Sequence, residues 1–219
     1  DDGSLYLVLE LLHGETLAER LARPPHLGWR EAAGLAQQLA RGLAALHAQG
    51  IIHRDLKPAN VILHCRLDED APEGPVAKII DLGISKVRAA AVDPALFATL
   101  TATGQILGTP QYMSYEQAVG DRDIDARTDV WALGVLLYEM LAGRRPFEGA
   151  NVNAVLAAIR RGPPPSLRER EGGIPPTLVT VVERCLTRDR GARFSGGAEL
   201  SAALDAAVSV AAGVVSLAA

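Results

Sequence analysis

The chain has 219 residues, and 48% of them are hydrophobic, which is enough to bury the core of one folded domain and excludes a disordered polymer. Its formal net charge of −4 argues against nucleic-acid binding as the main function. The two cysteines, Cys65 and Cys185, lack CxxC spacing, so we expect buried free thiols in a reducing cytosol and no zinc site.

The first half of the sequence predicts short strands and two helices. Residues 5–12 (LYLVLELL) form an apolar run typical of a buried strand. Residues 16–23 predict a short helix that ends at two prolines, and residues 29–49 predict a longer helix, because their leucines recur at helical spacing before Gly50. An acidic stretch (RLDEDAPEGP) predicts a hairpin loop between the last two of three further short apolar runs, which lie at residues 51–52, 61–63 and 76–80.

The second half predicts a mostly helical body. Residues 84–127 contain no periodic element, and a stretch of that length inside a domain is usually functional or mobile. Residues 128–143 are apolar almost all round, which predicts a helix buried in the middle of the domain. Residues 206–219 are uncharged but too few to span a membrane, so we expect the end of a helix and a tail there. Apolar stripes predict three further helices, at residues 150–161, 178–186 and 198–208.

One short segment, HRDLKPAN at residues 53–60, concentrates polar side chains between two apolar runs. Together with the motifs that follow it, this segment resembles the catalytic lobe of eukaryotic-type (Hanks-type) bacterial serine/threonine protein kinases. The motifs that carry the resemblance are HRDLKPAN (53–60), DLG (81–83), GTPQYMSYEQ (108–117), DVWALGVLLYEMLAGRRPF (129–147) and CLTRDRGARF (185–194). A lone HRD is a weak signal, whereas five motifs in the order and spacing of the family are a strong one.

The resemblance implies an α+β, protein-kinase-like fold that consists mostly of the helical C-terminal lobe with a few short β-strands. It assigns residues 1–14 to the end of the small lobe and the hinge, residues 15–209 to the C-terminal lobe, and residues 210–219 to a C-terminal tail. Within that lobe it places the catalytic loop at residues 53–60 and the activation segment at residues 81–116.

The catalytic loop contains the side chains that phosphoryl transfer requires, namely a carboxylate near the attacking hydroxyl, a cation on the phosphates and metal ligands. Asp55 is placed to accept the proton of the substrate hydroxyl, and Lys57 is suited to steadying the transferred phosphoryl group. Asn60 and Asp81 provide the hard oxygen ligands that Mg²⁺, or Mn²⁺, requires. By resemblance, Thr109 hydrogen-bonds the catalytic Asp and Lys.

The resemblance also implies an ATP site formed by the front of the chain. The backbone from Glu10 to Leu12 corresponds to the hinge that hydrogen-bonds adenine, and Leu9 corresponds to the residue at the back of the adenine pocket. Glu15 resembles the ribose contact, and Ile62 resembles the floor beneath the base.

Four residues are expected to position these groups. By resemblance, His53 is a packing residue rather than a base. Glu116 is expected to pair with Arg193 and so pin the activation segment to the helical body, while Asp129 accepts backbone N–H groups of the catalytic loop. Removal of one partner would leave a buried charge unpaired, at a cost of about 3–5 kcal/mol.

Arg54, which directly precedes Asp55, predicts control by phosphorylation. A phosphothreonine brings about −1.5 to −2 charges and acceptor oxygens that suit an arginine, and it can order a loop. We expect it at Thr101 or Thr103, which match phosphorylated positions of bacterial relatives, and we expect a kinase dimer for phosphorylation in trans. The alternative is that these threonines are polar loop residues without a regulatory role.

The sequence departs from the family pattern in three substitutions and one absence. Leu82 replaces the usual Phe and preserves apolar packing, Tyr115 replaces a Pro and is expected to loosen the anchor of the activation segment, and Arg190 replaces a Pro at little cost. The Gly-rich loop, the strand Lys and its helix Glu do not occur in the sequence, so we expect little or no activity from this chain alone.

Three functions remain open on the sequence. The first is a serine/threonine protein kinase that acts on protein substrates with ATP, and the second is a kinase-like scaffold without turnover, which the missing small lobe favours. The third is a small-molecule phosphotransferase of the aminoglycoside type, against which Lys57, residues 108–114 and residues 129–134 argue. We expect a cytoplasmic location, with the cytosolic domain of a larger membrane-anchored protein as the alternative, and no nucleic-acid partner.

Overall fold

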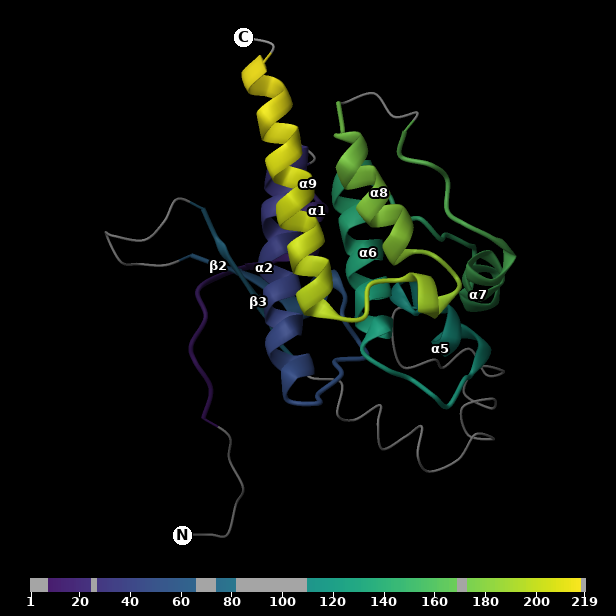
Figure 1. Ribbon diagram of the computed structural model, residues 1–219. Coiled ribbons are helices and arrows are strands. Elements are labelled where there is room, and N and C mark those ends of the chain that lie inside the picture. The colour runs from purple at the N-terminus through teal and green to yellow at the C-terminus, as the bar shows by residue number, and fades with distance from the viewer. Residues whose placement is uncertain (1–7, 25–26, 66–73, 82–109, 169–172, 218–219) are drawn as a thin grey trace, which may run out of the picture.

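The computed structural model describes residues 8–24, 27–65, 74–81, 110–168 and 173–217, with side chains as far as residue 213, and places a small sheet beside a helical body (Figure 1). The strands are β1 (Gly14–Thr16), β2 (Val61–His64) and β3 (Val76–Ile79). The helices are α1 (Leu17–Leu21), α2 (Trp29–Ala48), α5 (Tyr115–Val119), α6 (Arg127–Ala142), α7 (Val152–Arg161), α8 (Pro176–Cys185) and α9 (Gly197–Leu217). The 3-10 turns are η1 (Pro58–Asn60), η2 (Pro110–Tyr112) and η3 (Arg190–Ala192). This helix-rich arrangement confirms the predicted fold class.

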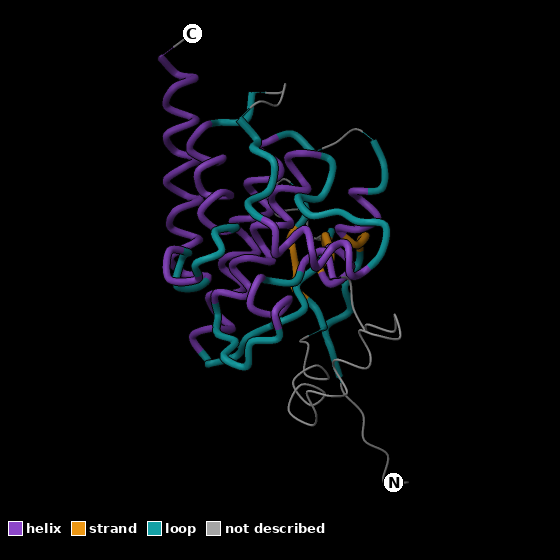
Figure 2. The backbone as a smooth tube through the Cα atoms, turned by 90° about the vertical axis from the view of Figure 1, so that its right-hand side faces the viewer, coloured by secondary structure: helices purple, strands orange, loops and turns teal. Residues whose placement is uncertain are grey.

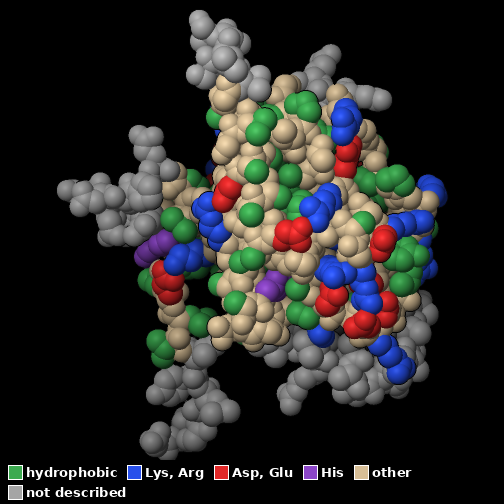
Figure 3. Space-filling model, in the orientation of Figure 1, with side chains coloured by type: hydrophobic (Ala, Val, Ile, Leu, Met, Phe, Trp, Pro, Cys, Tyr) green, Lys and Arg blue, Asp and Glu red, His purple; other side chains and the backbone are tan. Residues whose placement is uncertain are grey.

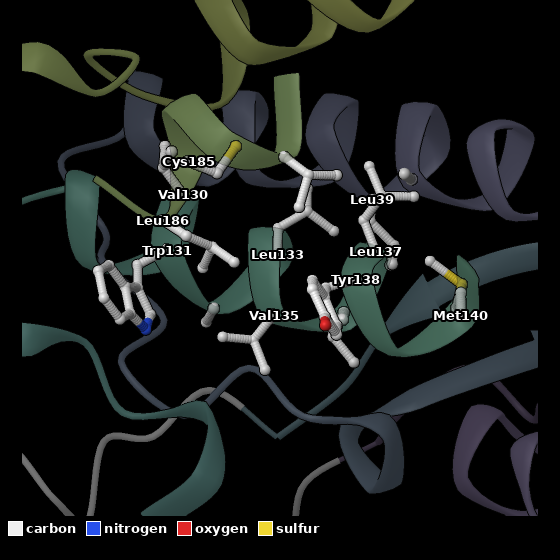
Figure 4. Packing of buried hydrophobic residues seen from close by; sticks show 14 of the residues in the cluster. Leu39, Val130, Trp131, Leu133, Val135, Leu137, Tyr138, Met140, Cys185 and Leu186 are labelled. Atoms are coloured by element: carbon white, nitrogen blue, oxygen red, sulfur yellow. The ribbon is translucent and has the colours of Figure 1, made fainter. Parts of the chain in front are cut away.

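The core forms where other helices enclose α6. Helix α6 contacts α2, α8 and α9, and α2 lies between α9 on one side and β3 on the other (Figures 1 and 2). Residues around the whole circumference of α6 are buried (Figure 4); Leu133, Leu136, Leu137 and Met140 are at most 1% exposed. A helix that is enclosed in this way has no polar face to offer to water, which is why its sequence is apolar almost all round.

Helices α6 and α8 approach one another closely at Gly134. A Cβ atom at this position would lie 2.5 Å from the Cβ atom of Cys185, so a larger residue would force the two helices apart. The close approach buries Cys185, and burial raises the pKa of its thiol to about 12. This thiol is therefore protonated and inert, as expected of a buried free cysteine. Cys65 is also free, but it is exposed and not buried as the sequence predicted.

The sheet has the order β1–β2–β3, with both pairs antiparallel. In β2, Val61 and Leu63 are buried, whereas Ile62 lies on the opposite, partly exposed face. Helix α2 covers the free edge of β3, because Gln38 Oε1 accepts a hydrogen bond of 2.9 Å from Ala77 N. The β2–β3 pair forms the predicted hairpin, although its tip lies outside the described residues.

Two predicted strands are wrong where the structure describes them. Of the strand predicted for residues 5–12, residues 5–7 lie outside the described residues, and residues 8–12 form no strand. Leu9 and Leu11 are 75% and 76% exposed, because no described strand pairs with this stretch or covers it. Residues 51–52 form no strand either. Ile51 N donates to Leu46 O of α2 at 3.0 Å, so this part of the chain still completes the end of the helix.

Two helices extend beyond the predicted elements. Helix α5 lies within the stretch that showed no periodicity, because a helix of 5 residues is too short to repeat a pattern. Its capping box was nevertheless readable, since Ser114 and Gln117 have the S-x-x-Q spacing and cap each other's backbone. Helix α9 continues to Leu217, beyond the stripe predicted for residues 198–208.

The surface mixes charges of both signs. Within the described residues, none of the helices combines the length and the apolar character that a membrane span needs. On the face seen in Figure 3, basic and acidic side chains lie close together. Exposed ion pairs of the chain include Arg168 with Glu183, Arg184 with Glu199 and Arg190 with Asp123.

Candidate active site

A buried carboxylate on α6 holds the catalytic loop, residues 53–60. Asp129 Oδ2 accepts a hydrogen bond of 2.8 Å from His53 N, and its Oδ1 accepts one of 2.8 Å from Arg54 N. Asp129 is fully buried, so water does not compete for these bonds. The structure thus contains the contact expected of Asp129, which fixes the backbone directly before Asp55.

A residue that the sequence did not single out, His47 of α2, completes this arrangement. His47 Nε2 lies 2.9 Å from Asp129 Oδ2, and Gly197 N donates to His47 Nδ1 at 3.1 Å. Because Nδ1 accepts a backbone N–H, the proton of the neutral ring lies on Nε2 and is donated to Asp129. His47 therefore links the start of α9 to the catalytic loop. A single histidine in the last turn of a helix carries no signal that could have shown this.

Arg54 combines two features that are uncommon in a folded chain. Its backbone is in the left-handed region, with φ of 64°, and its buried Nε has no hydrogen-bond partner among the described residues. Its carbonyl oxygen accepts a hydrogen bond of 3.1 Å from Gln117 Nε2. Helix α5, at the end of the activation segment, thus contacts the backbone of the catalytic loop directly.

The side chains of the catalytic loop converge on Asp55. Lys57 Nζ lies 3.0 Å from Asp55 Oδ2, and Asn60 Nδ2 donates to the carbonyl oxygen of Asp55 at 2.9 Å. The side chains of Asp55 and Lys57 remain 17% and 21% exposed, so both can be reached from solvent. The carboxylate and the ammonium are therefore close together on a solvent-accessible loop whose backbone is held by Asp129.

A backbone hydrogen bond of the neighbouring residue Ile80 places Asp81 next to this loop. Ile80 N donates to Asn60 O at 2.9 Å, and His53 Nε2 lies 3.2 Å from Ile80 O. Asp55 N donates to His53 Nδ1 at 3.3 Å, so both ring nitrogens of this buried histidine have partners, which suits a packing residue better than a base. Asp81 itself is exposed and has φ of 62°, a backbone conformation that is uncommon outside glycine and that concentrates at functional sites.

The donor set of Asn60 and Asp81 fits Mg²⁺. Because Asn60 Nδ2 donates to Asp55, the amide oxygen is the end of the side chain that can face a metal ion. Within the described residues there is no group of three or more His, Cys, Asp and Glu side chains that could hold a metal by themselves. Mg²⁺ suits such a sparse set, since it is usually bound by one or two carboxylates together with phosphates and water.

An ion pair anchors the end of the activation segment. Arg193 Nη1 and Nη2 donate to Glu116 Oε1 and Oε2, each at 2.9 Å, and the Arg193 guanidinium also lies over the ring of Trp131 at 4.7 Å. Burial alone would raise the pKa of Glu116, but the hydrogen bonds and the charge of Arg193 outweigh it and hold the pKa below its usual value. The structure thus contains the expected pair.

Tyr115, which replaces a Pro of the family pattern, is supported by its surroundings. It is half-buried against the core at the start of α5, and the guanidinium of Arg188 lies 5.2 Å from the centre of its ring. Ser114 caps the helix, and its Oγ lies 2.5 Å from Thr128 Oγ1 of α6. These contacts hold α5 in place despite the substitution.

The residues expected to bind the nucleotide differ in how exposed they are and in whether they already form ion pairs. Ile62 lies on the face of the sheet that points away from the core, and Leu12 is half-buried. Leu9 does not line the back of a pocket, because its side chain is exposed. Glu15 is bound at both carboxylate oxygens by Arg23, each at 2.6 Å, and Glu10 is paired with Lys78.

Several predicted residues cannot be placed. Thr101, Thr103 and Thr109 lie outside the described residues, as does Leu82.

Comparison with known proteins shows a match along almost the whole chain. The protein kinase domain family matches residues 1–206. The serine/threonine-protein kinase pkn2 of Myxococcus xanthus is 39% identical over 208 residues, which cover 92% of this chain and 23% of the relative. The serine/threonine-protein kinase PknA of Mycobacterium tuberculosis is 38% identical over 201 residues, and PknA of Corynebacterium glutamicum is 36% identical over 207. Each match covers 92% of this chain, but only 42% and 39% of the respective relative, so the chain spans less than half the length of these curated relatives.

Proposed function

Because the chain belongs to the protein kinase domain family, we propose that it is the catalytic part of a serine/threonine protein kinase, which transfers the γ-phosphate of ATP to Ser and Thr hydroxyl groups of proteins. The observation that carries the proposal is the contact between Asp55 and Lys57 in a loop whose backbone Asp129 fixes. The relatives, which are named serine/threonine-protein kinases, support the same reaction.

In the proposed reaction, Asp55 accepts the proton of the substrate hydroxyl. The hydroxyl oxygen then forms a bond to the γ-phosphorus, while the bond from that phosphorus to the bridging oxygen breaks and ADP leaves. The ammonium of Lys57, 3.0 Å from the carboxylate of Asp55, offsets the negative charge of the phosphoryl group in transit. Catalysis here depends mainly on positioning, which explains why buried contacts secure the loop from behind.

Protein kinase domains use ATP and a divalent metal ion, and we assign the ion in this chain to Asn60 and Asp81. The bound ion, Mg²⁺ or Mn²⁺, supplies positive charge that neutralises the phosphates. Asp81→Ala should therefore remove the Mg²⁺ dependence of ATP binding, whereas Asp123→Ala, a surface carboxylate paired with Arg190, should not. Unchanged Mg²⁺-dependent binding by Asp81→Ala would refute the assignment.

For the nucleotide, we assign the adenine contacts to the backbone from Glu10 to Leu12 and the floor beneath the base to Ile62. The open face of the sheet at Ile62 supports this arrangement. Glu15 can contact the ribose only after it leaves Arg23, and so ATP binding should break the ion pair between them.

Asp55→Asn in the full-length protein tests the proposed function directly, because we expect little or no activity from the 219-residue chain alone. The substitution removes the proton acceptor but retains the size of the side chain, so we expect loss of phosphate transfer with nearly unchanged ATP affinity. Transfer of radiolabelled phosphate to a protein acceptor, a titration with a fluorescent ATP analogue and phosphoamino-acid analysis measure the three parts of the proposal. Undiminished transfer by Asp55→Asn would refute the role of Asp55. A full-length wild-type protein that binds ATP without any transfer would instead be a kinase-like scaffold.

We also propose a cytoplasmic place of action. The reaction needs ATP, and both Cys65 and Cys185 are free thiols, which is typical of a reducing compartment.

A further inference from the structure

The segment that leads into β1, residues 8–13, is held by few contacts within the described part of the chain. It belongs to no strand, and the side chains of Val8, Leu9 and Leu11 are between 75% and 82% exposed, so apolar packing does not hold them. At its C-terminal end, Cys65 N donates to His13 O at 2.7 Å. The backbone between the two ends of the segment is ordered only if its N-terminal end is held as well.

The other end is held by an ion pair. Lys78 Nζ, on β3, lies 2.7 Å from each of the two carboxylate oxygens of Glu10. The hydrogen bond from Lys78 and its charge hold the pKa of Glu10 below its usual value, so the pair stays ionised at neutral pH. The backbone of residues 11 and 12 thus lies between two fixed points, one at Glu10 and one at His13.

The register of the sheet places Lys78 beside the proposed floor of the nucleotide site. Ile62 of β2 lies directly opposite Lys78 of β3 and opposite Thr16 of β1. Residues that lie opposite one another in an antiparallel pair project from the same face of the sheet, so Ile62 and Lys78 are neighbours on the face away from the core. Lys78 therefore connects this face to the hinge segment through a single side-chain contact.

We propose that Lys78 is a positioning residue of the nucleotide site, which holds the hinge backbone from Glu10 to Leu12 at a fixed distance from Ile62 through its ion pair with Glu10. Backbone groups that are already ordered bind a ligand without the loss of conformational entropy that a mobile segment incurs. This inference rests on the proposed function, because it concerns the residues that would bind ATP.

A direct contact between Lys78 and the bound nucleotide is the competing explanation, and a charge exchange separates the two. If Lys78 acts through Glu10, the double variant Glu10→Lys/Lys78→Glu retains the pair with reversed charges and binds ATP as the wild type does. If the ammonium contacts the phosphates or the ribose itself, the same variant places a carboxylate there and weakens binding further.

The experiment uses the 219-residue chain and the variants Lys78→Gln, Glu10→Gln and the charge exchange. Arg168→Gln/Glu183→Gln is the matched control, since it removes an exposed ion pair on another part of the molecule. Titration with trinitrophenyl-ATP and Mg²⁺ at low salt should give a dissociation constant about two- to five-fold higher for each single variant, the range for an exposed pair, and wild-type values for the exchange and the control. The difference should shrink at high salt, because salt screens exposed charges.

Hydrogen exchange of the amides of residues 10–13 without nucleotide is the second measurement. We expect faster hydrogen exchange in both single variants. The double variant Glu10→Lys/Lys78→Glu should show the hydrogen-exchange rates of the wild type. Unchanged exchange in Lys78→Gln, or unchanged ATP affinity despite faster exchange, would overturn the proposed role. Failure of the wild type to bind the ATP analogue would count against the proposed function instead, while the exchange data would still decide whether the pair holds the segment.

Discussion

Arg193 and Glu116 are 77 positions apart in the sequence, yet they meet through two hydrogen bonds of 2.9 Å with 2% and 4% of their surfaces exposed. The guanidinium also donates to the carbonyl oxygens of Thr187 and Arg188, at 2.7 and 3.1 Å. The pair thereby joins α5 to the loop before α9 at a place that water does not reach.

Glu116→Gln should be strongly destabilising. The substitution leaves the charge of Arg193 buried without its partner, which typically costs about 3–5 kcal/mol of unfolding free energy. Urea denaturation measures the change. The double variant Glu116→Gln/Arg193→Met should lose less than the sum of the single variants, because it removes the unpaired charge, and Glu183→Gln at an exposed pair should cause no measurable change. A loss below about 1 kcal/mol in Glu116→Gln would show that the pair is not a main anchor.

The same pair predicts a dependence of stability on pH. The pKa of Glu116 is lower in the folded protein than its usual value, so the unfolded chain takes up the proton more readily. The contribution of Glu116 to stability is therefore complete above the usual glutamate pKa of about 4.3 and is lost as the pH falls through the lower pKa of the folded state. The difference in unfolding free energy between wild type and Glu116→Gln should accordingly shrink in acid. A difference that stays constant from pH 7 into that range would contradict the pKa direction.

His47→Gln should disturb the catalytic loop without affecting nucleotide affinity. The substitution replaces the ring that donates to Asp129 and accepts from Gly197 N. A hydrogen bond to a charged group contributes about 1.5–3 kcal/mol, so phosphate transfer should fall by about ten-fold or more. The amides of His53 and Arg54, which donate to the same carboxylate, should exchange faster.

Gln37→Ala is the control for this histidine, since Gln37 lies on the same helix and bonds Asp205 of α9. A variant at His47 with wild-type transfer and wild-type exchange at residues 53 and 54 would show that Asp129 holds the loop unaided.

Two glycine substitutions should have opposite effects on stability. Gly134→Ala places a methyl group against Cys185 and should cost about 1–3 kcal/mol, because α6 and α8 must separate. Gly34→Ala on α2 meets no described atom within 4 Å and should stabilise the helix by about 0.5–1 kcal/mol. Thermal or urea unfolding compares the two. Equal effects in the two variants would contradict the close approach at Gly134.

Phosphorylation at Thr101 or Thr103 should raise activity through Arg54. The Nε atom of Arg54 is buried and has no hydrogen-bond partner within the part of the chain that the structure describes, so an anion that reaches it gains a charge-assisted bond. Mass spectrometry after incubation with ATP should find phosphate on one of these threonines. Thr101→Ala/Thr103→Ala should lower activity, Arg54→Gln should remove the response to phosphorylation, and Thr180→Ala on α8 should behave as wild type. A fully active double variant without phosphate between residues 82 and 109 would leave the threonines as ordinary loop residues.

Features that depend on neighbouring residues in the sequence could be predicted well. The stripes of α2 and α8 and the all-round apolar character of α6 gave these helices close to their observed bounds, because helical periodicity is a local property. The close spacing of Asp55, Lys57 and Asn60 in the sequence also indicated that their side chains lie together, since these residues share one tight loop. Where a helix is too short for its pattern to repeat, as in the five residues of α5, periodicity could not indicate it.

The sequence by itself therefore determined α2, α6 and α8, the β2–β3 hairpin and which polar side chains share the loop at residues 53–60. Only the tertiary structure decided which distant side chains complete that loop and its surroundings: His47 with Asp129, and Lys78 with Glu10. It also decided that Leu9 is exposed, although an apolar run looks the same whether or not another strand covers it. The physical reason is common to these cases: a single polar residue has no period, and both its partner and the burial of its neighbours depend on how elements far apart in the chain pack together.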